Sequence, residues 1–231
     1  MKKLVLLLLF SFTLCFPGWT QPSEIIRIKS GEQVPPYEKY LYRQFASGTV
    51  YLRNGQTPTV RLNNHLMLNE VQFIAPVGDT LTLAQLHTIS KVVINGDTFV
   101  FDQNSMPLRI LREYGAVKLA VNQSLQVANV DKEGAYGQSS GLSSITSYSS
   151  YPVPGGGIAK LEMKGDVVYS QRRSYYLINQ NGLSFPASRK SILKLFPRQK
   201  SAIDDYLQKT PVQFNSPDDL QRLLEFCGKG T

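Results

Sequence analysis

From Gly48 onward, apolar and polar residues alternate over a long stretch of the chain, a period of two that is typical of half-buried β-strands. Three Asn-Gly pairs, Asn54-Gly55, Asn95-Gly96 and Asn181-Gly182, interrupt the alternation. This dipeptide favours tight hairpin turns because both residues tolerate positive φ. The sequence therefore predicts antiparallel hairpins over residues 48–135, and a further β-hairpin region over 158–187.

Residues 188–231 change to helical spacing. A start signal is clearest near the end, where Ser216 precedes Pro217 and two aspartates that complement the positive end of a helix dipole. The apolar stripe that follows has the spacing i, i+3, i+4, i+7 and comprises Leu220, Leu223, Leu224 and Cys227. The predicted fold class is α+β: an antiparallel sheet built from hairpins, as a sandwich or a partial barrel, with C-terminal helices.

The first residues have the pattern of a secretory leader. Lys2 and Lys3 precede a predominantly apolar region of thirteen residues, and Pro17-Gly18 follows it. That run is shorter than the ~20 residues that a bilayer-spanning helix needs. We expect a signal peptide at residues 1–20, an N-terminal linker at 21–47, and an exported protein that is periplasmic, outer-membrane-associated or secreted.

Residues 136–157, YGQSSGLSSITSYSSYPVPGGG, contain no charge and are rich in serine and glycine. Such a segment buries little apolar area, so it is expected to form a long loop between strands of one sheet. Tyr148 and Tyr151 are its candidate binding residues, because tyrosine rings stack on sugars and on partner surfaces. The alternative is an insertion in which these tyrosines have no role.

Charge adds a second candidate surface. Removing the leader leaves 23 basic residues against 17 acidic ones, a net charge of +6. Nine basic residues fall within 160–200, where only two acids occur. The alternatives are a solvated face or a contact with an anionic envelope surface or a glycan, and nucleic acid is not expected. The candidate contacts in this segment are Arg172, Arg173, Arg189 and Lys190.

No spacing in the sequence indicates a catalytic, metal or cofactor site. His65 and His87 are the only histidines, and both are expected at the surface. Cys227 is the one cysteine beyond the leader, and its place on the apolar stripe predicts an unreactive core thiol. The favoured function is non-catalytic binding or structural support. The alternative is an envelope hydrolase whose acids are dispersed over strand ends and turns, namely Glu70, Asp79, Asp97 and Asp102.

Several stretches resemble a group of secreted, uncharacterised proteins of Bacteroidetes-type Gram-negative bacteria. They are QFIAPVGDTLTL, VVINGDTFVFD, KEGAYG, SSITSYSS and the ending LKLFPRQKSAIDDYLQKTPVQFNSPDDLQRLLEF. The resemblance covers residues 48 to 226. It implies a place in the cell envelope and no particular activity.

Overall fold

The computed structural model describes residues 25–29, 31–133, 139–140, 152–153, 157–158 and 165–228. Its strands are β1 (Ile25–Ile28), β2 (Ala46–Leu52), β3 (Thr59–His65), β4 (Glu70–Ile74), β5 (Thr80–Thr82), β6 (Ile89–Ile94), β7 (Asp97–Phe101), β8 (Pro107–Tyr114), β9 (Val117–Glu133), β10 (Ser139–Ser140), β11 (Pro152–Val153), β12 (Gly157–Ile158), β13 (Gly165–Ile178) and β14 (Ser184–Pro186). The helices are α1 (Pro36–Lys39), α2 (Arg189–Leu195), α3 (Lys200–Lys209) and α4 (Pro217–Gly228), with 3₁₀ turns η1 (Leu86–Thr88) and η2 (Pro197–Gln199). The expected leader lies outside the described residues, as do Tyr148, Tyr151 and most of the 136–157 loop.

The predicted α+β class is confirmed. Twelve strands form one open antiparallel sheet, whose main path has the order β1-β13-β9-β8-β7-β6-β2-β3-β4-β5. The hairpin predictions at the Asn-Gly pairs are also confirmed. At the turn between β6 and β7, for example, Asn95 and Gly96 have positive φ angles of 52° and 87°. The two strands pair directly from either side of this turn, beginning with Ile94 opposite Asp97.

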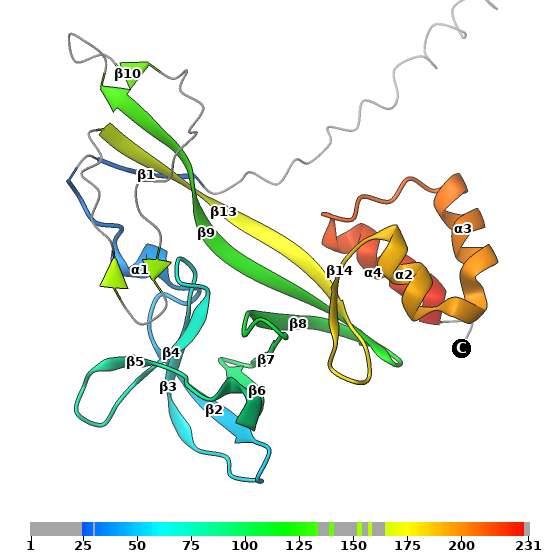
Figure 1. The fold of residues 1–231 in the computed structure, drawn as a ribbon, viewed down its shortest axis with the longest axis horizontal. Helices are drawn as coiled ribbons and strands as arrows, with labels where there is room; N and C mark the ends of the chain where they lie inside the picture. Colours follow the sequence, from blue (N-terminus) through cyan, green and yellow to red (C-terminus); the bar gives the residue numbers. More distant parts are fainter. Residues whose placement is uncertain are drawn as a thin grey trace, which may run out of the picture.

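Strands β9 and β13 form a long twisted ribbon through the molecule (Figure 1). Alternation alone suggested separate short strands around Val167 and Tyr175, whereas β13 is one strand of 14 residues beside the 17 residues of β9. The polar residues between the two apolar runs stay in the ladder, where Arg173 pairs with Gln123. The pairing confirms that the intervening loop leaves and re-enters one sheet.

The sheet curls until its far end returns to β9. The turn between β3 and β4 reaches β9, where the N–H of Leu125 donates to the carbonyl of Leu66 at 3.0 Å. The Nδ2 of Asn122 donates to Oδ1 of Asn69 at 2.7 Å. Strand β8 pairs with β9 only over Arg109–Tyr114. Beyond that range, the β3–β4 turn replaces β8 as the neighbour of β9. Apart from the short β11–β12 pair, the described strands therefore form one curled sheet rather than a two-sheet sandwich.

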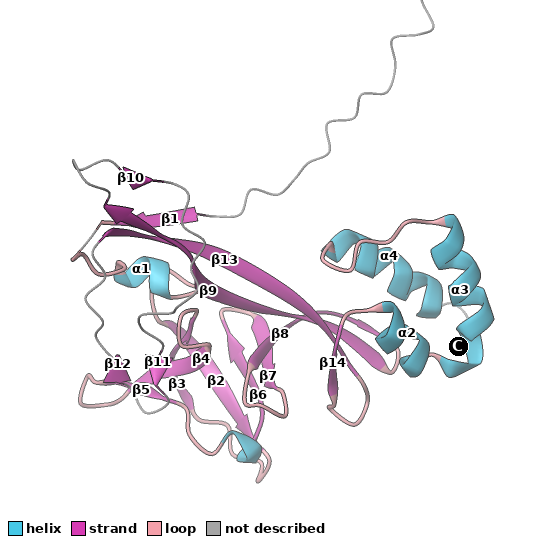
Figure 2. Ribbon diagram, turned by 45° about the horizontal axis from the view of Figure 1, so that its top comes forward, coloured by secondary structure: helices cyan, strands magenta, loops and turns pink. Residues whose placement is uncertain are grey.

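Helices α2, α3 and α4 gather at one end of the β9–β13 ribbon, while α1 and β1 lie toward its other end (Figure 2). The C-terminal helix predictions are confirmed, including the predicted cap, since Ser216 Oγ accepts from Asp219 N. Ser188 Oγ caps α2 in the same way by accepting from Ser191 N. Cys227 is fully buried, as expected, in the apolar cluster that the C-terminal helices share with the sheet. Among the described residues, no helix combines the length and apolar character needed to cross a membrane.

The segment expected as an N-terminal linker contains both β1 and α1. Strand β1 pairs with β13 at the edge of the sheet. After α1, the chain runs alongside the end of β3: Leu41 N donates to Asn64 O at 2.9 Å, and Leu66 N donates to Lys39 O at 2.7 Å. These bonds hold residues 37–43 opposite the β9–β13 ribbon.

Candidate ligand-binding cleft

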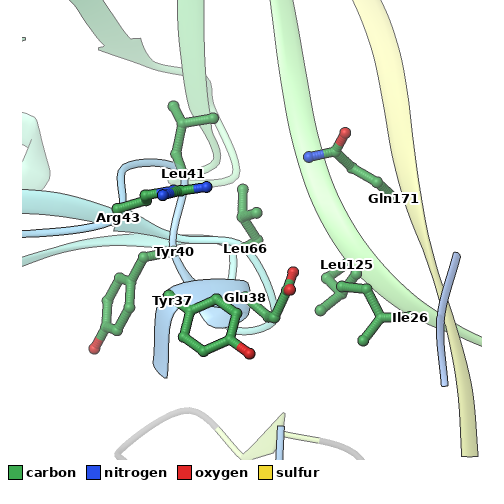
Figure 3. Close-up of a pocket in the computed structure, with 9 residues that line it drawn as sticks. All are labelled: Ile26, Tyr37, Glu38, Tyr40, Leu41, Arg43, Leu66, Leu125 and Gln171. Atoms are coloured by element: carbon green, nitrogen blue, oxygen red, sulfur yellow. The ribbon is translucent and has the colours of Figure 1, made fainter. Parts of the chain in front are cut away.

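A cleft of about 240 Å³ opens between the 37–43 segment and the ribbon (Figure 3). One side carries side chains of α1 and the residues after it, and the other carries side chains of β1, β9 and β13. The turn between β3 and β4 supplies the floor. The lining residues are Tyr37, Glu38, Tyr40, Leu41 and Arg43, then Ile26, Leu125 and Gln171, with Leu66 between them.

The first side is fixed by aromatic and hydrogen-bonded contacts. Tyr40 donates its hydroxyl to Oε1 of Gln72 at 2.7 Å. Its ring lies edge-on to those of Phe45 and His65, with centroids 5.0 and 4.8 Å apart. Burial raises the pKa of Tyr40, and the charge of Glu70 acts in the same direction. Tyr40 is therefore a neutral, immobilised part of the wall.

The second side is built on the sheet ladder. Leu125 of β9 and Gln171 of β13 are direct cross-strand partners, so their side chains share one face of the ribbon. Leu125 also belongs to a buried apolar cluster that includes Ile28, Val34 and Leu66. The cleft thus has an apolar floor and a polar upper edge at Gln171.

Three side chains in the cleft have no polar partner among the residues that the structure describes. Tyr37 is 58% exposed, and among the described residues no hydrogen bond or ion pair involves its hydroxyl, the Glu38 carboxylate or the Arg43 guanidinium. Gln171 differs, because its Oε1 accepts from Arg173 Nη2 at 3.2 Å. The Arg43 guanidinium and the Gln171 amide extend toward the gap from opposite sides (Figure 3). The cleft therefore offers an aromatic ring, one acid, one base and an amide to a ligand.

A buried polar network behind the cleft anchors the 41–43 segment. Tyr42 donates its hydroxyl to Oδ2 of Asp97 at 2.6 Å, and Arg109 pairs with the same carboxylate at 3.3 Å. Arg109 also donates to Oε1 of Gln123 at 3.0 Å. Burial raises the pKa of Tyr42 far above its usual value, with the hydrogen bond to Asp97 as the next cause. These side chains bond mainly to one another, which indicates a structural role, and among the described residues only the Nε of Arg109 in this network is buried without a hydrogen-bond partner.

The expectation that His65 is a surface residue is wrong. Only 8% of His65 is exposed, because Tyr40 and the segment after α1 cover it. Its Nδ1 accepts from the N–H of Leu68 at 3.0 Å, which helps to shape the turn that carries Leu66. Burial lowers the pKa of His65. His87, by contrast, is exposed in η1 as expected.

The basic residues singled out in the sequence do not form one site with the cleft. Arg172 and Arg173 are both exposed, and as successive residues of β13 they point to opposite faces. Arg189 begins α2 and pairs with Asp204 at 2.9 Å, and Lys190 is exposed beside it. Of the predicted residues, Arg173 is the one that contacts a lining residue of the cleft.

The dispersed acids of the alternative hypothesis stay dispersed. Asp97 lies in the network behind the cleft, and Glu70 bonds to Gln72 and Thr82. In the described ranges, no group of three or more histidine, cysteine or acidic side chains is placed to hold a metal ion. Glu38 is the one described acid that lines the cleft.

The cleft residues escaped sequence reasoning because α1 has only four residues and no periodic pattern. Within 37–43, YEKYLYR, three tyrosines alternate with charged and apolar residues. That density of aromatic and charged side chains is the signal that could have marked a contact surface.

Comparisons of the chain with protein-family models, with curated proteins and with solved structures find no match. The resemblance to secreted proteins of Bacteroidetes-type bacteria therefore stays a prediction.

Proposed function

We propose that this chain is an exported, non-catalytic binding protein of a bacterial cell envelope, and that the cleft is its ligand site. The observation that carries the proposal is the convergence on a cleft with an apolar floor of Tyr37, Glu38 and Arg43, whose polar groups bond to no other described residue. In small-ligand sites, a few polar groups of this kind fix the orientation of the ligand. The leader-like N-terminus and the resemblance described above support export.

The lining favours binding over hydrolysis. Hydrolysis of a glycosidic bond normally uses two carboxyl groups, ~5–10 Å apart, on either side of the bond. Glu38 has no second acid beside it among the described lining residues. The cleft can therefore orient a ligand, whereas it lacks the acid–base pair of such an enzyme.

Ligand-observed NMR on the exported protein tests the proposal. The panel contains neutral and acidic monosaccharide glycosides and dipeptides at millimolar concentration. We expect at least one member to bind, and Tyr37→Ala to abolish its signal. Tyr51→Ala is the matched control, since Tyr51 lies on β2 beneath Lys91, away from the cleft. Failure of the whole panel, or equal loss in the Tyr51 variant, would contradict a ligand site here.

Cell fractionation tests the location. We expect the protein, expressed with its leader in a Gram-negative host, outside the cytoplasm and shortened at its N-terminus. Retention of full-length protein in the cytoplasm would contradict the proposed export. This outcome is independent of whether the cleft binds a ligand.

A further inference from the structure

The orientation of Gln171 gives the cleft a donor-rich upper edge. Its Oε1 is occupied by Arg173 Nη2 at 3.2 Å, so its Nε2 hydrogens remain for a ligand. On the other side of the gap lies the Arg43 guanidinium, which bonds to no other described residue and adds up to five N–H donors (Figure 3). Two sets of donors, one of them cationic, match the two oxygens of a carboxylate.

The rest of the cleft suits a polyhydroxylated ring. The exposed ring of Tyr37 can cover the carbon face of a sugar, while Leu66 and Leu125, both nearly fully buried, form the apolar floor beneath it. Glu38 can accept hydrogen bonds from hydroxyl groups, which a carboxylate end of the ligand cannot donate. The ligand therefore needs hydroxyls near Glu38 and an acid near Arg43.

The volume of the cleft limits the size of the ligand that it can bind. A volume of about 240 Å³ is below the ~300–1,000 Å³ of sites that enclose drug-sized ligands. One sugar unit, or the end of a longer chain, fits such a site better than an extended peptide.

We propose that the cleft binds a saccharide that carries a carboxylate, of the uronic-acid type, with the acid between Arg43 and Gln171. This inference rests on the proposed function, because it names the ligand class of the same cleft. The protein would thus recognise an acidic polysaccharide or glycan through a single sugar residue.

The experiment compares methyl β-D-glucuronide with methyl β-D-glucoside. The two differ only at C6, which is a carboxylate in the glucuronide and a hydroxymethyl group in the glucoside. Dissociation constants are measured by NMR titration at about 20 mM salt. We expect the glucuronide to bind at least 5-fold more tightly, and its advantage to shrink at about 300 mM salt because the added charge pair is partly screened.

Two variants locate the carboxylate. Arg43→Gln should remove the preference for the glucuronide, so that the variant binds the two glycosides with equal affinity. Gln171→Glu replaces the amide donors with a second carboxylate, and it should weaken glucuronide binding at least 5-fold. Arg172→Gln is the control, since this neighbouring arginine points to the opposite face of β13. Melting temperatures of all three variants establish that they fold.

The possible results are distinct. Equal affinity for the two glycosides, or a preference that survives Arg43→Gln, would overturn the acidic-sugar inference and leave the binding function standing. Binding of a dipeptide but neither glycoside would also overturn it while the cleft remained a ligand site. If no member of the wider panel bound, both proposals would fall.

Discussion

Leu66 and Leu125 lie side by side although 58 residues separate them in the chain, and the N–H of Leu125 donates to the carbonyl of Leu66 at 3.0 Å. This bond joins the β3–β4 turn to β9 where β8 no longer pairs. It closes the curl of the sheet and sets the floor of the cleft. Fold closure and cleft geometry therefore depend on the same contacts.

Asn122 is the side chain that secures this closure. It is 5% exposed, and its Nδ2 donates to Asn69 Oδ1 at 2.7 Å and to Pro107 O at 3.0 Å. We expect Asn122→Ala to lower the free energy of unfolding by about 1–3 kcal/mol, because both acceptors lose their donor in a buried place. Urea denaturation measures this loss. Gln126→Ala, on the exposed part of the same strand, should change stability by less than about 0.5 kcal/mol; a similar loss in both variants would contradict the role of Asn122.

Tyr42 and Tyr37 form a matched pair for testing the network behind the cleft. The Tyr42 hydroxyl is 2.6 Å from Asp97 Oδ2, whereas no described residue bonds the Tyr37 hydroxyl. Tyr42→Phe should cost about 1.5–3 kcal/mol, since the lost hydrogen bond is to a charged group. Tyr37→Phe should leave the free energy of unfolding unchanged. Urea denaturation measures the free energy of unfolding of both variants. Equal values for the two would show that the hydrogen bond from Tyr42 to Asp97 does not stabilise the fold.

The sheet and the C-terminal helices were predictable because their signals are local. Asn95-Gly96 fixes a turn through its own backbone preferences, and the Leu220–Cys227 stripe marks a buried helix face within two turns. The curl of the sheet has no local signal. It depends on contacts such as that of Asn69 with Asn122, whose sequence separation is 53.

The cleft was less predictable than the fold for the same reason. Tyr40 is positioned by Gln72, 32 residues later, and Arg43 faces Gln171 only after β13 has joined the sheet. Charge density led to Arg172, Arg189 and Lys190 because counting charges ignores which face each residue occupies. Arg173, the fourth basic residue that charge density indicated, bonds to the cleft residue Gln171.

His65 makes stability depend on pH. Burial lowers its pKa; the charge of Lys39 acts in the same direction and that of Glu70 opposes it. The unfolded chain therefore takes up the proton more readily than the folded protein. The stability that depends on neutral His65 is complete above its ordinary value of 6.5 and is lost as the pH falls through the lower folded pKa. Protonated Nδ1 also cannot accept from Leu68.

The measurement is the free energy of unfolding at pH 7.5 and pH 5.5 for the parent and for His65→Asn. We expect the parent to lose stability on acidification by no more than about 1.4 kcal/mol per pH unit from this group. His65→Asn should be less stable at pH 7.5 but should show a shallower pH dependence. His87→Asn, an exposed control, should follow the parent, and a slope in His65→Asn equal to that of the parent would remove His65 as the cause.

Gly48 allows β2 to lie close to its neighbours. A Cβ at this position would be 2.5 Å from the Val93 carbonyl oxygen and 2.8 Å from Leu62 Cδ1. Backbone of β6 must therefore move to admit any side chain, and we expect Gly48→Ala to cost ~1–3 kcal/mol. Gly228→Ala is the control, since a Cβ there meets nothing within 4 Å. Thermal melts of the two variants should separate clearly, and a parent-like melt of Gly48→Ala would refute this packing argument.

Cys227 should be unreactive while the protein is folded. It is fully buried against Gln199, whose Nε2 donates to the Cys227 carbonyl at 2.9 Å, and burial raises the pKa of its thiol to about 11. At pH 8 only about one thiol in a thousand is then ionised, and the thiolate is the nucleophile. A disulfide reagent such as DTNB should label the leaderless protein at least ~100-fold more slowly than free cysteine, with one thiol titrating after denaturation in guanidinium. Labelling of the native protein at the rate of free cysteine would mean that α4 leaves the ribbon easily, because Cys227 is reachable only if that helix opens.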